Sequence, residues 1–98
     1  MKLKLVVRRI AENEMEEAVA WYHEISPELA GRFARAVDLA YQRILSNPQR
    51  HGFGHFGTRH CQLKSFPYQI HYLVEATSVV IMAVFNTHRD PESLRTRH

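Results

Sequence analysis

The sequence is short of the residues on which several classes of protein depend. Its 98 residues include one cysteine, Cys61, so no disulfide can form within the chain and a reducing compartment is expected. The longest apolar run, residues 79–85, is too short to span a bilayer, and the first ten residues lack the features of a signal peptide. We therefore expect a single domain over residues 1–98, located in the cytoplasm and not associated with a membrane.

Charge of each sign is confined to parts of the chain. Residues 10–28 carry six acidic side chains and no Lys or Arg, whereas residues 1–9 carry four basic side chains and no acid. The net charge is +3, so the chain beyond residue 28 is also basic. A basic surface favours nucleic acid or an acidic protein as a partner, although such charge also serves solubility alone.

The first half of the chain predicts one strand and two helices. Apolar residues at 3, 5 and 7 alternate as in a strand. Two helical patterns follow, with Asn13 and Glu16 as a capping box for the first helix and Ser26-Pro27 as the start of the second. Asn47-Pro48 is expected to end the second helix. The expected apolar stripes of this helical hairpin are Met15, Ala18, Val19, Tyr22 and Ile25, then Leu29, Phe33, Ala36, Val37, Ala40, Ile44 and Leu45.

The second half predicts three strands. Residues 59–64 and 68–75 alternate in character on either side of a Phe66-Pro67-Tyr68 corner, while residues 79–85 are apolar throughout, as in a central strand. A hairpin covering one sheet face gives a two-layer α+β domain, with a mainly antiparallel sheet, the order β-α-α-β-β-β and a short C-terminal helix. The expected shared core is Phe33, Ile44, Leu63, Ile70, Ile81 and Val84. The opposite sheet face should stay open and present His60, Gln62, Lys64, Gln69 and His71, with Arg89 and Arg95 near one end.

This order of signals resembles the RelE/ParE toxins of bacterial type II toxin-antitoxin (plasmid stabilisation) systems. The resemblance spans nearly the whole chain and rests on Trp21-Tyr22, Asn47-Pro48, Arg59, Phe66-Pro67-Tyr68 and His88-Arg89-Asp90-Pro91. It implies the α+β fold described above, no cofactor, and a separately encoded antitoxin as partner. It also allows a dimer or a heterotetramer with that antitoxin.

One branch of this family consists of ribosome-dependent mRNA endonucleases, which act by metal-free transesterification. Their catalytic residues, two lysines, two arginines and a tyrosine, are matched here by His60, Gln62, Gln69, Arg89 and Arg95. Arg89 alone is kept, and a glutamine neither neutralises phosphate nor transfers protons. A ribonuclease would therefore have to use His60 and His71 as acid and base, with Arg89 as the stabilising cation.

The ParE branch, which poisons DNA gyrase, also lacks that catalytic set, and the corner and the residues 88–91 look closer to it. The resemblance then implies that the chain traps gyrase on cleaved DNA through surface shape and basic charge rather than through an active site. The candidate target-binding residues are Arg59, Lys64, Arg89, Arg95 and Arg97. Two alternatives stay open, the mRNA endonuclease and a non-toxic binding module, and arginines near a helix end also serve as ordinary dipole partners.

Histidine and aromatic residues also allow simpler interpretations. His51 and His55 lie in a glycine-rich segment where a four-residue spacing defines no shared face, and His60 and Cys61 should project from opposite faces of a strand. We therefore expect no metal site. Trp21 and Tyr22 are expected to pack in the core rather than to stack on bases, and Tyr68 and Tyr72 share the inward side of their strand.

Overall fold

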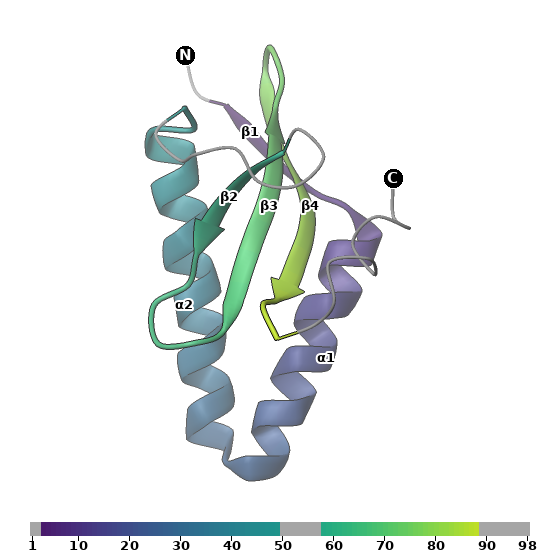
Figure 1. Ribbon diagram of the computed structural model, residues 1–98, viewed down its shortest axis with the longest axis vertical. Coiled ribbons are helices and arrows are strands. Elements are labelled where there is room, and N and C mark those ends of the chain that lie inside the picture. The colour runs from purple at the N-terminus through teal and green to yellow at the C-terminus, as the bar shows by residue number, and fades with distance from the viewer. Residues whose placement is uncertain (1–2, 50–57, 89–98) are drawn as a thin grey trace.

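The computed structural model describes residues 3–49 and 58–88. Within them the elements are β1 (Lys4–Val7), α1 (Arg9–Ile25), α2 (Pro27–Ser46), β2 (Arg59–Gln62), β3 (Tyr68–Val74) and β4 (Ser78–Asn86) (Figure 1). This is the predicted order. The predicted C-terminal helix lies outside the described residues, as do Arg89, Arg95, Arg97 and the histidines at positions 51 and 55.

The strands form one mixed sheet in the order β1-β4-β3-β2. β1 pairs with β4 in parallel, whereas β2 with β3 and β3 with β4 pair antiparallel. The apolar strand β4 is therefore central, as predicted from its unbroken apolar run. The hairpin formed by α1 and α2 packs against one sheet face, which gives the expected two-layer α+β domain.

The start of α1 differs from the prediction, whereas α2 agrees with it. α1 begins at Arg9 and its N-cap, Arg8, makes no side-chain cap hydrogen bond, so the predicted capping box at Asn13 is wrong. The reason lies in the sheet, because the Arg8 N–H donates to the Ile81 carbonyl (3.1 Å) and the helix starts directly where this ladder ends. At α2, the Ser26 hydroxyl accepts from the Leu29 N–H (3.3 Å), as expected of an N-cap.

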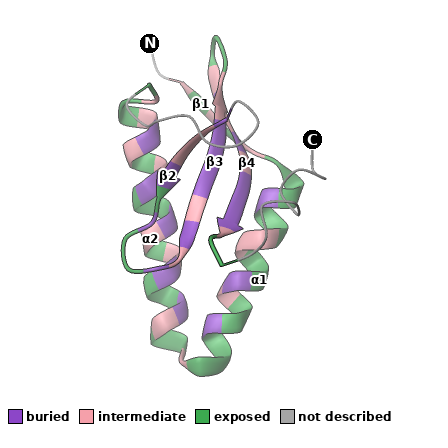
Figure 2. Cartoon of the chain, viewed as in Figure 1, coloured by how far each residue is buried: buried purple, intermediate pink, exposed green. Residues whose placement is uncertain are grey.

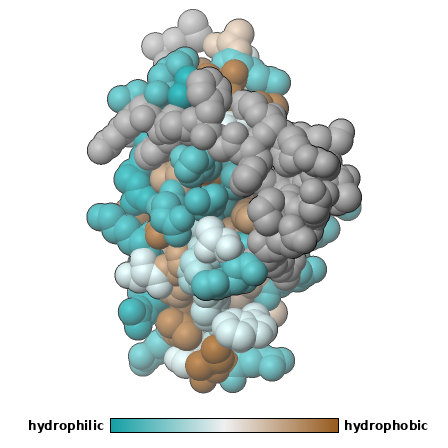
Figure 3. Space-filling view, in the orientation of Figure 1, coloured by the Kyte–Doolittle hydropathy of each residue, from teal (hydrophilic) through white to brown (hydrophobic). Residues whose placement is uncertain are grey.

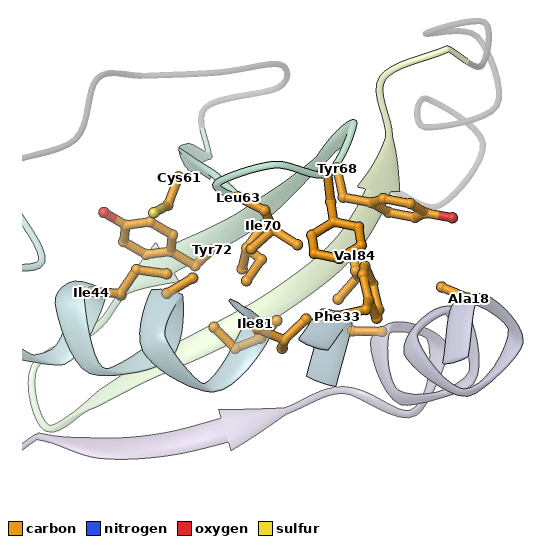
Figure 4. Close-up of a cluster of buried hydrophobic side chains, with 14 of the residues drawn as sticks. Ala18, Phe33, Ile44, Cys61, Leu63, Tyr68, Ile70, Tyr72, Ile81 and Val84 are labelled. Atoms are coloured by element: carbon orange, nitrogen blue, oxygen red, sulfur yellow. The ribbon is translucent and has the colours of Figure 1, made fainter. Parts of the chain in front are cut away.

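Four aromatic rings form the centre of the core. Tyr22 from α1, Phe33 from α2, and Phe66 and Tyr68 from the corner have ring centroids 5.1–6.3 Å apart in the pairs that touch. Most of these pairs meet edge to face, the arrangement that aromatic quadrupoles favour. Figure 4 shows strand side chains, among them Ile70 and Val84, pointing toward the helices beside Phe33. All six residues of the predicted core are buried: Phe33, Ile44, Leu63, Ile70, Ile81 and Val84.

A β-bulge in β4 explains how Ile81 and Val84, three residues apart, both face the helices. Ile81 is paired with Tyr72 and Ala83 with His71, so Met82 is an extra residue in the ladder. The insertion shifts the alternation of the second half of the strand by one position. Ala83 and Phe85 consequently face away from the hairpin and form a second, small buried cluster.

The C-terminal end of α1 carries apolar side chains that nothing in the described residues covers fully. Trp21 is 63% exposed and Ile25 is 60% exposed, so the prediction that both belong to the core is wrong. Ile25 is the last residue of α1, at the tip of the hairpin, and this tip extends past the ends of the strands, as Figure 2 shows. Trp21 lies on a different side of the helix from the core residues Ala18 and Tyr22. Apolar surface is accordingly present at this tip in Figure 3. Tyr22, one position away from Trp21, points inward and is buried.

Replacement of Phe33 by alanine should lower the free energy of unfolding by about 3–5 kcal/mol, because it removes a fully buried ring and leaves a cavity. The matched control on the same helix is Leu39→Ala, since Leu39 is 54% exposed, and its cost should stay within about 0.5 kcal/mol. Urea unfolding of both variants measures the difference. Similar costs for the two substitutions would contradict the assigned register of α2.

Candidate functional site

The sheet face opposite the hairpin, called here the far face, brings several predicted site residues together. In the β2–β3 ladder, His60 lies opposite His71 and Gln62 lies opposite Gln69. The imidazole centroids of His60 and His71 are 5.8 Å apart. Gln62 is exposed, while His60 and Gln69 are half-buried. Lys64, just beyond the end of β2, is also exposed.

His71 does not lie on an open surface, contrary to the prediction. Its side chain is 1% exposed, the Thr58 hydroxyl oxygen lies 3.3 Å from its Nδ1, and the Phe85 ring meets it edge to face. The bulge is the physical reason, because it turns Ala83 and Phe85 toward the far face, beside this imidazole. A substrate on the surface therefore has no direct path to His71, and His60 is the more accessible of the two histidines.

Gln62 has a structural role at the corner. Its Nε2 donates to the carbonyl of Phe66 (3.2 Å) and, at 3.5 Å, to that of Leu63. Between these residues Ser65 adopts a φ of 68°, in the left-handed region that non-glycine residues seldom occupy. The glutamine side chain thus holds a tight turn in place, whatever else it contacts.

Of the predicted target-binding cations, the structure describes Arg59 and Lys64. The guanidinium of Arg59 donates to the Gln49 carbonyl (3.3 Å) and to its side-chain oxygen (3.1 Å). These bonds tie the start of β2 to the end of α2. Lys64 is exposed, so its ammonium group can reach a partner, whereas Arg89, Arg95 and Arg97 lie outside the described residues.

A cleft between α1 and the ends of β3 and β4 was not predicted from the sequence. Its volume is about 430 Å³, within the range of small-ligand pockets. The spacing of its α1 residues, three and four apart, could have indicated a shared helix face. Its lining residues are Glu14, Glu17, Ala18, Trp21, Tyr22, Pro67, Tyr68, Val84, Asn86 and His88.

A side-chain hydrogen bond joins the two walls of this cleft. β1 pairs with β4 only as far as Ile81, so among residues 3–49 and 58–88 the part of β4 beyond it has no strand neighbour on that side. The Val84 N–H donates instead to the Glu14 carboxylate, at 3.0 Å. At the base of the cleft the Asn86 amide contacts the Tyr68 hydroxyl (3.5 Å). A buried backbone donor is thus satisfied by a charged acceptor, which is stronger than a neutral one.

Tyr72 links the sheet to the end of α2. Its hydroxyl donates to the Pro48 carbonyl, at 2.7 Å. Burial raises the pKa of Tyr72 to about 12, although the positive charge of Arg59 opposes the shift. Burial likewise raises the pKa of Tyr41 to about 12. Both hydroxyls therefore stay protonated in the folded protein well above the pH at which free tyrosine ionises.

Two further features bear on function. Within residues 3–49 and 58–88, no three His, Cys, Asp or Glu side chains come together as ligands for a metal ion. Neither described helix is long and apolar enough to cross a membrane.

Comparison with known proteins identifies the fold. No family model matches the sequence, and no curated protein does. Among solved structures, the chain is similar to a chain of the chromosomal ParDE TA system from P. aeruginosa, with a TM-score of 0.76 and 18% identity. The match covers 87% of this chain and 96% of that one. At this identity the likeness establishes the fold, and the ParE-like toxin fold indicated by the sequence is confirmed.

The raised pKa values of the two tyrosines predict a loss of stability in alkali. An unfolded tyrosine loses its proton near pH 10.0, whereas folded Tyr72 and Tyr41 retain theirs to about pH 12. Between these two pH values the folded state binds more protons than the unfolded state, so the free energy of unfolding should fall as pH rises. Below this window both tyrosines are protonated in both states, and they should not make the free energy of unfolding depend on pH. Urea unfolding across the window measures the slope, and Tyr72→Phe should make it shallower. An unchanged slope in that variant would rule out Tyr72 as a source.

Proposed function

We propose that this protein is the toxin of a type II toxin-antitoxin pair and that it inhibits DNA gyrase. The observation that carries the proposal is the fold likeness to a chain of a ParDE TA system across 87% of this chain. A fold alone hosts more than one activity. The choice of target therefore rests on the residues of the far face.

Those residues argue against the ribonuclease alternative. Cleavage by the RNA 2′-hydroxyl needs a general base, a general acid and cations near the phosphate. His71 is buried against Phe85, and Gln62 is engaged in holding the corner. This leaves His60 without the accessible histidine partner that the ribonuclease alternative requires. An activity that depends on surface contacts rather than on chemistry fits this arrangement better.

The proposed target contacts are the exposed Lys64 together with Arg89, Arg95 and Arg97. Lys64 follows β2 near the corner, and the arginines follow the end of β4 in the sequence. The Thr87 N–H donates to the Pro67 carbonyl at 2.8 Å, which brings the end of β4 to the corner. We assign Arg59 a supporting role, because its guanidinium is held by Gln49.

The proposed antitoxin would cover apolar surface that the folded chain leaves exposed. Trp21, Ile25 and Leu39, on the hairpin, are each more than half exposed. Aromatic residues that become buried on binding supply much of the binding energy of protein interfaces, so Trp21 is the first of these to test as an anchor. The basic parts of the surface would in addition attract an acidic segment of such a partner.

The purified protein should inhibit supercoiling by gyrase and should leave mRNA intact in a translating system. Arg89→Ala combined with Arg95→Ala should weaken inhibition while thermal unfolding stays unchanged. The control is His60→Gln, which should inhibit as the wild type does. His71→Ala is unsuitable as a control, because it would remove a buried side chain. If wild-type protein cuts ribosome-bound mRNA and the His60 variant does not, the target is the ribosome.

The association of the protein with its antitoxin should slow as ionic strength rises, because screening weakens long-range attraction between opposite charges. Stopped-flow measurements at several salt concentrations give this dependence. Lys64→Gln should make the dependence weaker, since it removes an exposed positive charge without altering the core. A rate that does not change with salt would exclude electrostatic steering.

A further inference from the structure

The cleft beside β4 combines a strand edge with an acidic helix face. The Val84 N–H points out of the sheet toward α1, where it meets the Glu14 carboxylate. In a strand the N–H and C=O groups of one residue point to the same side. The Val84 carbonyl therefore faces the cleft too and offers a backbone acceptor on one of its walls.

The other wall presents negative charge and an indole ring. Glu14, Glu17 and Trp21 line the cleft from positions three and four apart on α1. Trp21 is 63% exposed, and its ring meets the buried Tyr22 ring edge to face at 5.2 Å, which restricts its orientation. The indole thus has one side supported by the core and much of its surface free for contact.

The charged side chains that line this cleft are acidic in the part of the chain that the structure describes. No Lys or Arg is among these described lining residues, and residues 10–28 contain none. Two carboxylates beside an aromatic face and a backbone carbonyl form a site suited to a cation with several hydrogen-bond donors. Arginine meets these needs better than lysine, because its planar guanidinium stacks on aromatic rings and donates in several directions at once.

We propose that this cleft binds an arginine side chain of a partner polypeptide, with the guanidinium stacked on Trp21 and hydrogen-bonded to the Glu17 carboxylate and the Val84 carbonyl. A polypeptide fits because the cleft is open at the surface and one of its walls is a strand edge that pairs with no other strand among the described residues. The assignment does not depend on the chain being a toxin. The proposal also predicts that the partner carries a basic residue at this cleft. Elsewhere the partner would carry acidic residues, because the rest of this chain is basic.

An NMR titration of the full chain tests the proposal. The probe is N-acetyl-arginine N-methylamide, and its neutral isostere, N-acetyl-citrulline N-methylamide, is the reference. Trp21 is the single tryptophan in the sequence, so its indole N–H gives one unambiguous signal, and the Val84 amide is the second reporter. We expect saturable shifts of both signals with the arginine probe and at least about tenfold weaker binding of citrulline.

Variants locate the contact. Glu17→Gln should weaken binding by about threefold to tenfold, a modest effect because the carboxylate is exposed and screened by water. Trp21→Leu should weaken it by a similar factor through the loss of stacking, read at the Val84 amide. The matched control is Glu24→Gln, on the same helix but outside the cleft, which should bind as the wild type does.

Three results would overturn the proposal. Equal binding of the citrulline probe would show that the cleft does not recognise charge. An equal loss of affinity in the Glu17 and Glu24 variants would reduce the effect to general attraction by an acidic helix. Binding that is seen only after removal of residues 89–98, which include three arginines, would make this segment of the chain itself the occupant instead of a partner.

Discussion

The four-ring cluster of Tyr22, Phe33, Phe66 and Tyr68 is the contact on which the rest of the structure depends. It joins both helices to the corner between β2 and β3, and each ring pair adds about 0.5–1.5 kcal/mol beyond the burial of its area. Because the Pro67 carbonyl accepts from Thr87, the same corner also fixes the end of β4. The four-ring cluster thus positions the end of β4 and the cleft, whose lining includes Tyr22 and Tyr68.

Local patterns in the sequence were sufficient for the order of elements, the end of α2 and the inward side of β2 and β3. They were insufficient where the burial of a side chain depends on residues that are distant in the sequence but close in the fold. Ile25 follows the helical stripe, but whether it is covered depends on how far the sheet extends beneath the end of α1. His71 follows the outward alternation of β3, yet it is buried because a residue inserted in β4 brings Phe85 beside it. The cleft was missed for the same reason, since its walls are far apart in the sequence.

The charge segregation seen in the sequence corresponds to distinct surfaces of the fold. The acidic stretch becomes α1, whose carboxylates line the cleft, while an exposed lysine lies beyond β2. A partner that met both surfaces would need complementary charges in separate parts of its chain. Such an arrangement would fix the direction in which a partner segment runs, because reversing it would place like charges together.

The extra residue in β4 also has an evolutionary consequence. Tyr72 is paired with Ile81 and His71 with Ala83, so loss of the codon for Met82 would leave an unbroken ladder with each remaining side chain on its present face. At a regular position in a strand, deletion of one residue moves every side chain after it to the opposite face of the sheet. Related chains one residue shorter at this place could therefore keep the same core and the same far face, and would lose only the local twist that a bulge adds.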